Sequence, residues 1–196
     1  MSEYTKHLTP RPELRERIIE TAVKAFAAQG IKSITMDDIA TSLGISKRTL
    51  YEVFPDKETL LEECILRGQK EGDEYLKNVL ATSENVLEVL LKCYQRSIEK
   101  FHATNKKFFE DIKKYPKAYK LMTKRHDQDS EETVNFFKEG VKQGIFRDDV
   151  NFAIINLLVR EQIDLLMNTD ICKEYSFLEV CLLYTSDAAD DLTRVD

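Results

Sequence analysis

Residues 35–57 read TMDDIATSLGISKRTLYEVFPDK, a stretch that predicts two short helices joined by a tight turn. Gly44 is the residue type that most readily adopts the left-handed conformation with which many helices end. Ser46 is suited to begin the next helix, because its hydroxyl accepts a free N–H group of the first turn. Thr35 and Asp38 have the spacing of a capping box at the start of the first helix. The break between the two helices is therefore encoded locally.

The two predicted helices each have an apolar face and can share a small core across the turn. Three other side chains, Lys47, Arg48 and Tyr51, are expected to point outward together, because residues three and four apart lie on the same side of a helix. Arginine can bond guanine through two N–H groups, and lysine and tyrosine can hold phosphate. These side chains favour binding to duplex DNA. The alternative is an ordinary solvated face, since many helices carry two basic residues.

Four groups of residues follow one another at a fixed spacing: Thr35 with Ile39-Ala40, Gly44-Ile45-Ser46, Thr49-Leu50-Tyr51 with Phe54, and Lys57 with Leu60. Together they resemble the helix-turn-helix of the TetR/AcrR family of bacterial transcription regulators. Residues 144–149, GIFRDD, also look like the turn that precedes the penultimate helix of that family. The resemblance implies that DNA is contacted by Ser46 and Thr49 at phosphates, by Lys47 and Arg48 at bases, by Tyr51 and Lys57 at the backbone, and also by Thr35.

The composition is typical of an all-helical protein. The chain has 196 residues, 42% of them hydrophobic, with only 6 Gly and 4 Pro. No apolar run approaches the roughly 18 residues needed to span a membrane, and the N-terminus lacks the apolar core of a signal peptide. We therefore expect a cytoplasmic protein without membrane contact.

The net charge of −6 is unevenly distributed along the chain. Residues 1–70 contain 11 Lys and Arg against 11 Asp and Glu, which leaves 18 against 24 for residues 71–196. The acidic excess lies away from the DNA-binding motif, as expected for a DNA-reading head on a body that stays clear of DNA. An acidic body also simply favours solubility.

No motif for catalysis or for a cofactor is present. The sequence has no glycine-rich phosphate loop, paired-histidine metal motif or nucleophile elbow. The spacing of the four cysteines supports neither zinc nor a disulfide framework, so we interpret them as reduced core thiols, with redox sensing as the lesser alternative; they are Cys64, Cys93, Cys172 and Cys181. We expect no cofactor, no metal and no enzymatic activity.

The remaining helices are expected from their apolar periodicity and capping residues. They comprise residues 12–29 ending at Gly30, a long helix capped by Asp56, one opening at Ser83 or Glu84, one capped by Asn105, a segment from 117 to 143 ending at Gly144, and one from about 150 to 168. The 117–143 segment contains a polar run, residues 124–132, that is either a kink or a loop. The last predicted helix is apolar on two sides, which suits the middle of a bundle or a partner chain.

We therefore expect a flexible arm (1–10), a three-helix DNA-binding domain (11–56), and a helical-bundle domain (57–180) for ligand binding and dimerisation. By resemblance, the bundle holds a small-molecule pocket and forms a homodimer through its C-terminal helices. Aromatic residues that would line the pocket are Tyr94, Phe101, Phe108, Tyr119 and Phe137. Plain core packing is the alternative for each of them.

Residues 181–190, CLLYTSDAAD, do not continue the helical pattern. They resemble one reading frame of a common transposon-based sequencing adapter, so we expect residues 181–196 to be non-native and the native sequence to stop near Val180. An ordinary polar C-terminus is the alternative.

The sequence and the family resemblance together predict a DNA-binding transcription regulator, namely a repressor that a small molecule releases from a pseudo-palindromic operator. A helical architectural or interaction protein that binds DNA without ligand control is the main alternative. An enzyme in the helical body is a third possibility, and it would keep its turnover when Arg48 is replaced.

Overall fold

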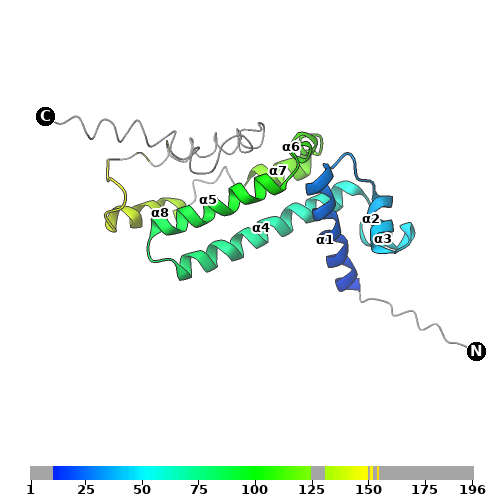
Figure 1. Ribbon diagram of the computed structural model, residues 1–196, viewed down its shortest axis with the longest axis horizontal. Coiled ribbons are helices and arrows are strands. Elements are labelled where there is room, and N and C mark those ends of the chain that lie inside the picture. Colours follow the sequence, from blue (N-terminus) through cyan, green and yellow to red (C-terminus); the bar gives the residue numbers. More distant parts are fainter. Residues whose placement is uncertain (1–10, 125–130, 150, 152–153, 155–196) are drawn as a thin grey trace, which may run out of the picture.

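The computed structural model describes residues 11–124, 131–149, 151 and 154. These residues form helices and contain no β-strand, which confirms the all-α prediction (Figure 1). The helices are α1 (Arg11–Gln29), α2 (Met36–Leu43), α3 (Lys47–Val53), α4 (Lys57–Thr82), α5 (Val86–Ala103), α6 (Lys106–Ile112), α7 (Pro116–Lys124) and α8 (Glu131–Lys142). None of the helices among these residues is long and apolar enough to cross a membrane.

The predicted boundary residues are confirmed for most helices. Gly30, Gly44 and Gly144 have positive φ angles of 86°, 66° and 70°, and each follows the end of a helix. Asp56 accepts the backbone N–H of Thr59 at 2.7 Å, which caps α4. Asn105 caps α6 in the same way, and α7 begins at Pro116, one residue before the expected start at 117. Local chemistry therefore sets these boundaries.

The predicted start of α5 was too early by two or three residues. The helix begins at Val86, and its cap is Asn85, whose side-chain oxygen accepts the backbone N–H of Glu88 at 3.0 Å. The expected caps, Ser83 and Glu84, lie before it. All three residue types are capping or first-turn residues, so the sequence alone did not discriminate between them.

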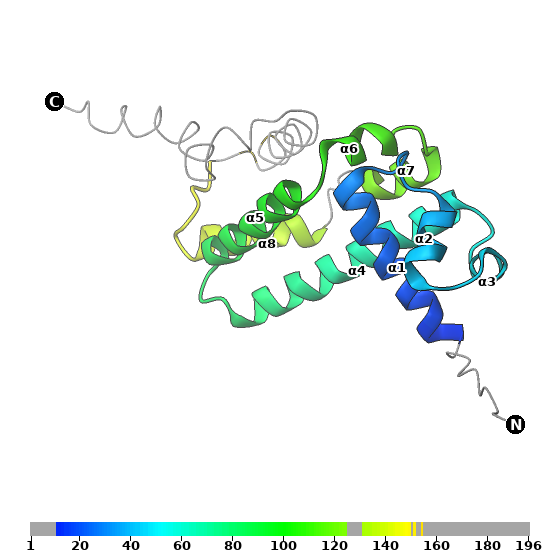
Figure 2. The same cartoon turned by 45° about the vertical axis from the view of Figure 1, so that its right-hand side comes forward.

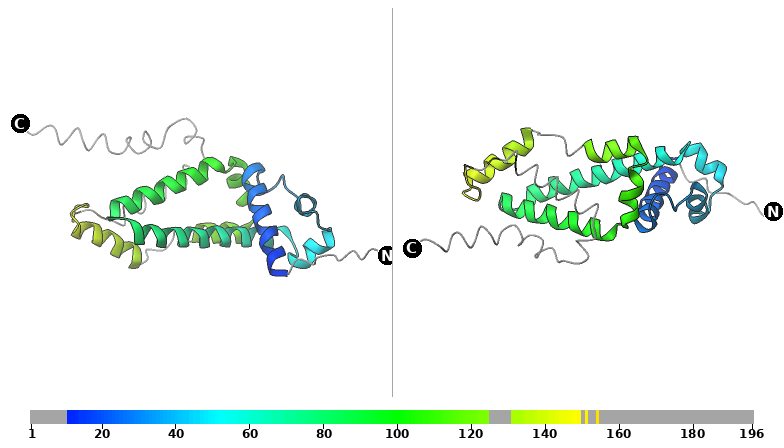
Figure 3. Two further views of the ribbon diagram at one scale, coloured as in Figure 1. Left: turned by 60° about the horizontal axis from the view of Figure 1, so that its bottom comes forward. Right: turned by 90° about the horizontal axis from the view of Figure 1, so that it is seen from above.

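The helices form an elongated molecule with the first three at one end (Figure 1). We call α1–α3 the head and α4–α8 the body. The long helix α4 runs from the head along the body, and α5 returns beside it, as Figures 2 and 3 show from other directions. Helix α7 packs on α4 near the head, whereas α8 packs on α5 at the far end. The segment expected from 117 to 143 is thus two helices, and residues 125–130 between them lie outside the described residues.

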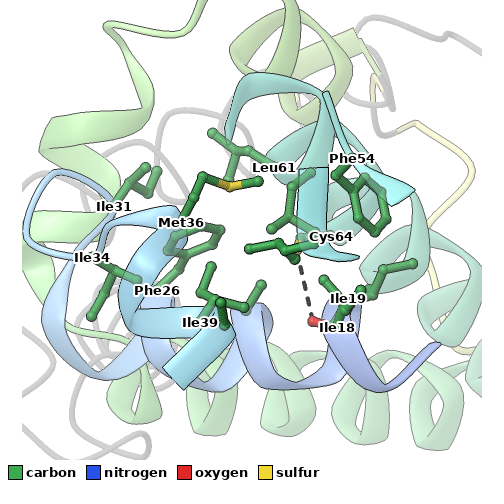
Figure 4. Packing of buried hydrophobic residues seen from close by; sticks show 14 of the residues in the cluster. Ile18, Ile19, Phe26, Ile31, Ile34, Met36, Ile39, Phe54, Leu61 and Cys64 are labelled. Carbon is green, nitrogen blue, oxygen red and sulfur yellow. Dashed lines mark hydrogen bonds between the residues drawn. The ribbon is translucent and has the colours of Figure 1, made fainter. Parts of the chain in front are cut away.

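One apolar core joins the head to the near end of the body (Figure 4). It contains Phe26 of α1, Ile39 of α2 and Phe54 after α3, together with Leu61 and Cys64 of α4. The Cys64 thiol donates a weak hydrogen bond to the Ile19 carbonyl at 3.8 Å. Because buried residues of α4 complete this core, packing is continuous across the predicted boundary between residues 56 and 57. The domain boundaries themselves stay a prediction.

Helix α6 fastens the body to the C-terminal end of α1. The backbone N–H of Asn105 donates to the Ala27 carbonyl at 2.7 Å, and its side-chain amide donates to the Ala28 carbonyl at 3.2 Å. Gly30 lies so close to α6 that a Cβ atom there would stand 2.7 Å from Cβ of Lys107. These contacts therefore fix the position of the head relative to the body.

Three predictions lie outside the described residues: the arm at 1–10, the helix at about 150–168 apart from residues 151 and 154, and the non-native tail at 181–196.

Candidate DNA-binding surface

The turn between α2 and α3 has the geometry that its sequence predicts. Gly44 ends α2 in the left-handed conformation, with φ 66° and ψ 29°. Ser46 then caps α3, because its hydroxyl oxygen accepts the backbone N–H of Thr49 at 3.1 Å. Ile45 and Leu50 face the core, which fixes the rotation of α3 about its axis. This rotation decides which side chains of α3 reach solvent.

Three side chains of α3 are exposed on one face: Lys47 at 64%, Arg48 at 89% and Tyr51 at 47%. They stand in the first two turns of the helix, where free N–H groups add positive potential. The cations pair with acids on the surface. Lys47 forms an ion pair with Asp37 of α2, and Nε of Arg48 lies 3.1 Å from the Glu52 carboxylate. Their contact with DNA stays a prediction.

The two carboxylates, Asp37 and Glu52, were not among the predicted site residues. The hydrogen bond from Lys47 to Asp37, followed by their charge attraction, raises the pKa of Lys47. Glu52 stands four residues after Arg48, a spacing that is visible in the sequence, whereas Asp37 comes from the other helix of the motif. Exposed pairs of this kind contribute little to stability, so a phosphate or base can replace either acid at small cost.

The predicted DNA contacts Thr35 and Thr49 have structural roles in the free protein. The Thr35 hydroxyl donates to the Asp38 carboxylate at 2.6 Å and accepts the Asp38 N–H at 3.1 Å, so the predicted capping box is present. The hydrogen bond from Thr35 lowers the pKa of Asp38. The Thr49 hydroxyl lies 2.8 Å from that of Ser46. Both hydroxyls therefore lie at helix N-termini, where phosphate oxygens are favoured.

Lys57 lies apart from the exposed face of α3. Its ammonium group donates to the Ile31 carbonyl and lies 5.8 Å from the centre of the Phe26 ring. Burial lowers the pKa of Lys57, while the charges of Asp111 and Asp38 oppose that shift. In the free protein this lysine joins the start of α4 to the end of α1. A phosphate contact by Lys57 stays a prediction and would require its ammonium group to turn away from Ile31.

The five aromatic residues proposed to line a pocket do not lie in one place. Phe101 and Phe108 both contact Phe109, with ring centres 5.6 and 5.5 Å apart, at the end of α5 nearest the head. Phe137 contacts Phe146 at 5.8 Å, beside the opposite end of α5. Tyr94 is half-buried on α5, and Tyr119 is exposed on α7. Their role as pocket residues stays a prediction.

Metal binding finds no support in the part of the chain that the structure describes. No three His, Cys, Asp or Glu side chains come together there in a way that would hold a metal ion.

Comparison with known proteins gives the same interpretation of the head. Residues 18–64, from within α1 to the first turns of α4, match the family described as bacterial regulatory proteins, tetR family. The repressor KstR2 of Mycolicibacterium smegmatis is 27% identical over 152 residues, which cover 75% of this chain and 74% of that protein. The biofilm operon regulator IcaR of Staphylococcus aureus is 32% identical over 72 residues, 37% of each chain.

Solved structures share the fold beyond the head. A regulator from Saccharomonospora viridis in complex with choline has a TM-score of 0.67 at 25% identity and covers 78% of this chain and 82% of that one. KstR2 of Mycobacterium tuberculosis has a TM-score of 0.55 at 21% identity, and the match covers 78% of this chain and 81% of that one. At this identity the match shows similarity of fold alone. The similarity therefore includes the helical body as well as the DNA-binding motif.

Proposed function

Because this chain is a TetR-family transcriptional regulator that binds DNA, we propose that it works as a homodimeric repressor and leaves a pseudo-palindromic operator when a small molecule binds its body. The observation that supports this most directly is the exposed face of α3, where Lys47, Arg48 and Tyr51 stand together beside a capped N-terminus. Repression is proposed because the relatives in the comparison are named as repressors or negative regulators.

The proposed contacts follow from the position of each side chain. A recognition helix enters the major groove with its N-terminal residues toward the bases. Arg48 is the most exposed of the three and is assigned to a base, since its guanidinium can donate two parallel hydrogen bonds to guanine. Ser46, Thr49 and Tyr51 are assigned to phosphates, and Lys47 to a base or a neighbouring phosphate.

A dimer is proposed because α3 has only two helical turns and buries too little surface for tight specific binding by itself. Two copies would place their recognition helices in successive major grooves, about 34 Å apart. A ligand that changes this separation lowers affinity for the operator, because only one separation fits both grooves. Since bacterial DNA lies in the cytoplasm, we place the protein there.

Selection of bound duplexes from a random pool tests the proposal. We expect an enriched consensus with two-fold symmetry and half-sites about 10 base pairs apart. An asymmetric consensus would contradict the dimer, and the absence of any consensus would contradict sequence-specific regulation. Operator affinity that stays unchanged across a metabolite screen would contradict ligand control and favour an architectural DNA-binding protein.

A further inference from the structure

A groove between α4 and α5 has the features of a binding site. Its volume is about 400 Å³, within the range of sites that hold small molecules, and it is open to solvent. The residues that line it are Tyr75 of α4 and Arg96, Glu99, Lys100 and Ala103 of α5. Helices α4 and α5 contact each other in the fold. None of the five aromatic residues expected at a pocket lines this groove.

Arg96 is held in the groove by neutral groups. Its guanidinium carbon lies 4.0 Å from the centre of the Tyr75 ring, and Nη2 donates to the Glu71 carbonyl at 3.1 Å. The Tyr75 hydroxyl in turn donates to the Lys92 carbonyl at 3.2 Å, which fixes the ring. These contacts orient the guanidinium without neutralising its charge.

Glu99 in the groove and Glu71 nearby each form a hydrogen bond with another residue of the same helix. Glu99 accepts a hydrogen bond from the side-chain amide of Gln95 at 2.9 Å, and Glu71 accepts one from Arg67 at 3.0 Å. Within residues 11–124 and 131–149, neither Arg96 nor Lys100 forms an ion pair with a carboxylate. The groove thus contains two cations, Arg96 and Lys100, and one acid, Glu99, which leaves an excess of one positive charge.

The pKa of Lys100 reflects both its burial and the charges around it. Burial lowers the pKa of Lys100, the positive charge of Arg96 lowers it further, and Glu71 only partly opposes the change. An anion between Arg96 and Lys100 would remove the repulsion between them. It would also gain charge-assisted hydrogen bonds, which are among the stronger polar contacts in proteins.

We propose that this groove binds a small organic anion, whose carboxylate or phosphate lies on Arg96 and Lys100 and whose apolar part lies against Tyr75 and Ala103. The inference rests on the proposed function in one respect: the anion is taken to be the small molecule that releases the repressor from its operator. The groove is placed to act in this way, since Tyr75 belongs to α4, and the N-terminal residues of α4, Leu61 and Cys64, lie in the core shared with the head.

Isothermal titration calorimetry of the full-length protein, without DNA, tests the site. The probes all have an eight-carbon alkyl chain and differ in the charge of the head group. We expect octanoate or octyl phosphate to bind at least tenfold more tightly than octanol or octylammonium. Inorganic phosphate tests the cations without the apolar wall. If it binds as tightly as octyl phosphate, the apolar wall contributes nothing to affinity, and that part of the proposal is overturned. Equal binding of the anions and octylammonium would overturn all of it.

A charge-matched pair of variants locates the site. Arg96→Gln with Lys100→Gln removes the two groove cations, and Lys77→Gln with Lys120→Gln removes two exposed lysines elsewhere on α4 and α7. We expect the preferred anion to bind at least tenfold more weakly to the groove variant and unchanged to the control. An equal effect in both would overturn the assignment. If the groove variant does not fold, the probe series on the wild-type chain still decides between anion and cation.

The same titrations separate this inference from the proposed function. A chain that selects a symmetric operator but binds no anion contradicts the inference alone. A chain that binds octanoate through Arg96 and Lys100 but selects no operator contradicts the proposed function and leaves the site intact.

Discussion

The carboxylate of Asp111 in α6 accepts a hydrogen bond from the backbone N–H of Lys32, 79 residues earlier in the chain, at 2.7 Å. Asp111 is only 8% exposed, and its position places a negative charge of the body directly beside the loop between α1 and α2. The charge also acts on Lys57, the residue that binds the Ile31 carbonyl in the same loop. Head and body are therefore joined by polar contacts as well as by the apolar core.

Replacing Asp111 by alanine is expected to lower the free energy of unfolding by about 1 to 3 kcal/mol, because it removes a charged acceptor and leaves the Lys32 N–H unpaired. Urea denaturation followed by circular dichroism measures the change. Asp111→Asn keeps an oxygen acceptor and should cost less than Asp111→Ala. Unchanged stability of the alanine variant would show that this bond does not hold the head on the body.

Gly30→Ala is expected to destabilise the protein, because φ at this position is +86° and the new Cβ would meet Lys107 at 2.7 Å. Gly68→Ala is the matched control. Gly68 lies within α4 with nothing within 4 Å of a new Cβ, so that substitution should stabilise the helix by about 0.5 to 1 kcal/mol. Melting temperatures of the two variants should thus move in opposite directions, and a shift of the same sign would contradict this packing.

Cys64 is expected to be unreactive in the folded protein. It is 7% exposed, and burial raises the pKa of its thiol to about 12, so almost no thiolate exists at pH 8.5. Iodoacetamide labelling followed by peptide mass spectrometry should modify Cys93, which is half-buried, before Cys64, and urea should abolish the difference. Rapid modification of Cys64 in the folded chain would favour the redox-sensing alternative.

Lys57→Ala is expected to weaken binding to all DNA sequences by a similar factor. Because the proposed dimer carries two copies of Lys57, it should also reduce the salt dependence of binding by about two units of slope, if both ammonium groups reach phosphates. Urea denaturation of the same variant measures the separate effect of losing the bond to Ile31. Lys77→Ala, farther along α4, is the control and should leave both properties unchanged. An unchanged salt slope in the Lys57 variant would restrict this lysine to its structural role.

Features encoded by neighbouring residues could be predicted from the sequence. The capping box of Thr35 and Asp38 and the positive φ of Gly44 depend on three or four consecutive positions, and so does the cap at Ser46. The start of α5 was misplaced because Ser83, Glu84 and Asn85 compete for the same local role. Local capping chemistry narrows such a boundary to a few residues but does not choose among them.

Features that depend on tertiary contacts were not visible in the sequence. Lys57 is directed toward Ile31 by the packing of α4 on α1, and nothing in its neighbours indicates that orientation. The pairing of Asp111 with Lys32 requires the body to fold back on the head. Arg96 and Tyr75 come together only because α5 returns beside α4. The five aromatic residues that were expected to line a pocket are instead distributed over α5, α6, α7 and α8.

The central claim is that α3 reads a DNA sequence, and the ratio of two dissociation constants tests it most directly. Fluorescence anisotropy at one physiological salt concentration would compare the selected duplex with a scrambled duplex of equal length. We predict that the selected duplex binds at least about 10³-fold more tightly. We also predict that Arg48→Ala costs about 1 to 3 kcal/mol for each half-site of the selected duplex and little on the scrambled one. Equal affinity for the two duplexes, or an equal loss on both with Arg48→Ala, would contradict the account.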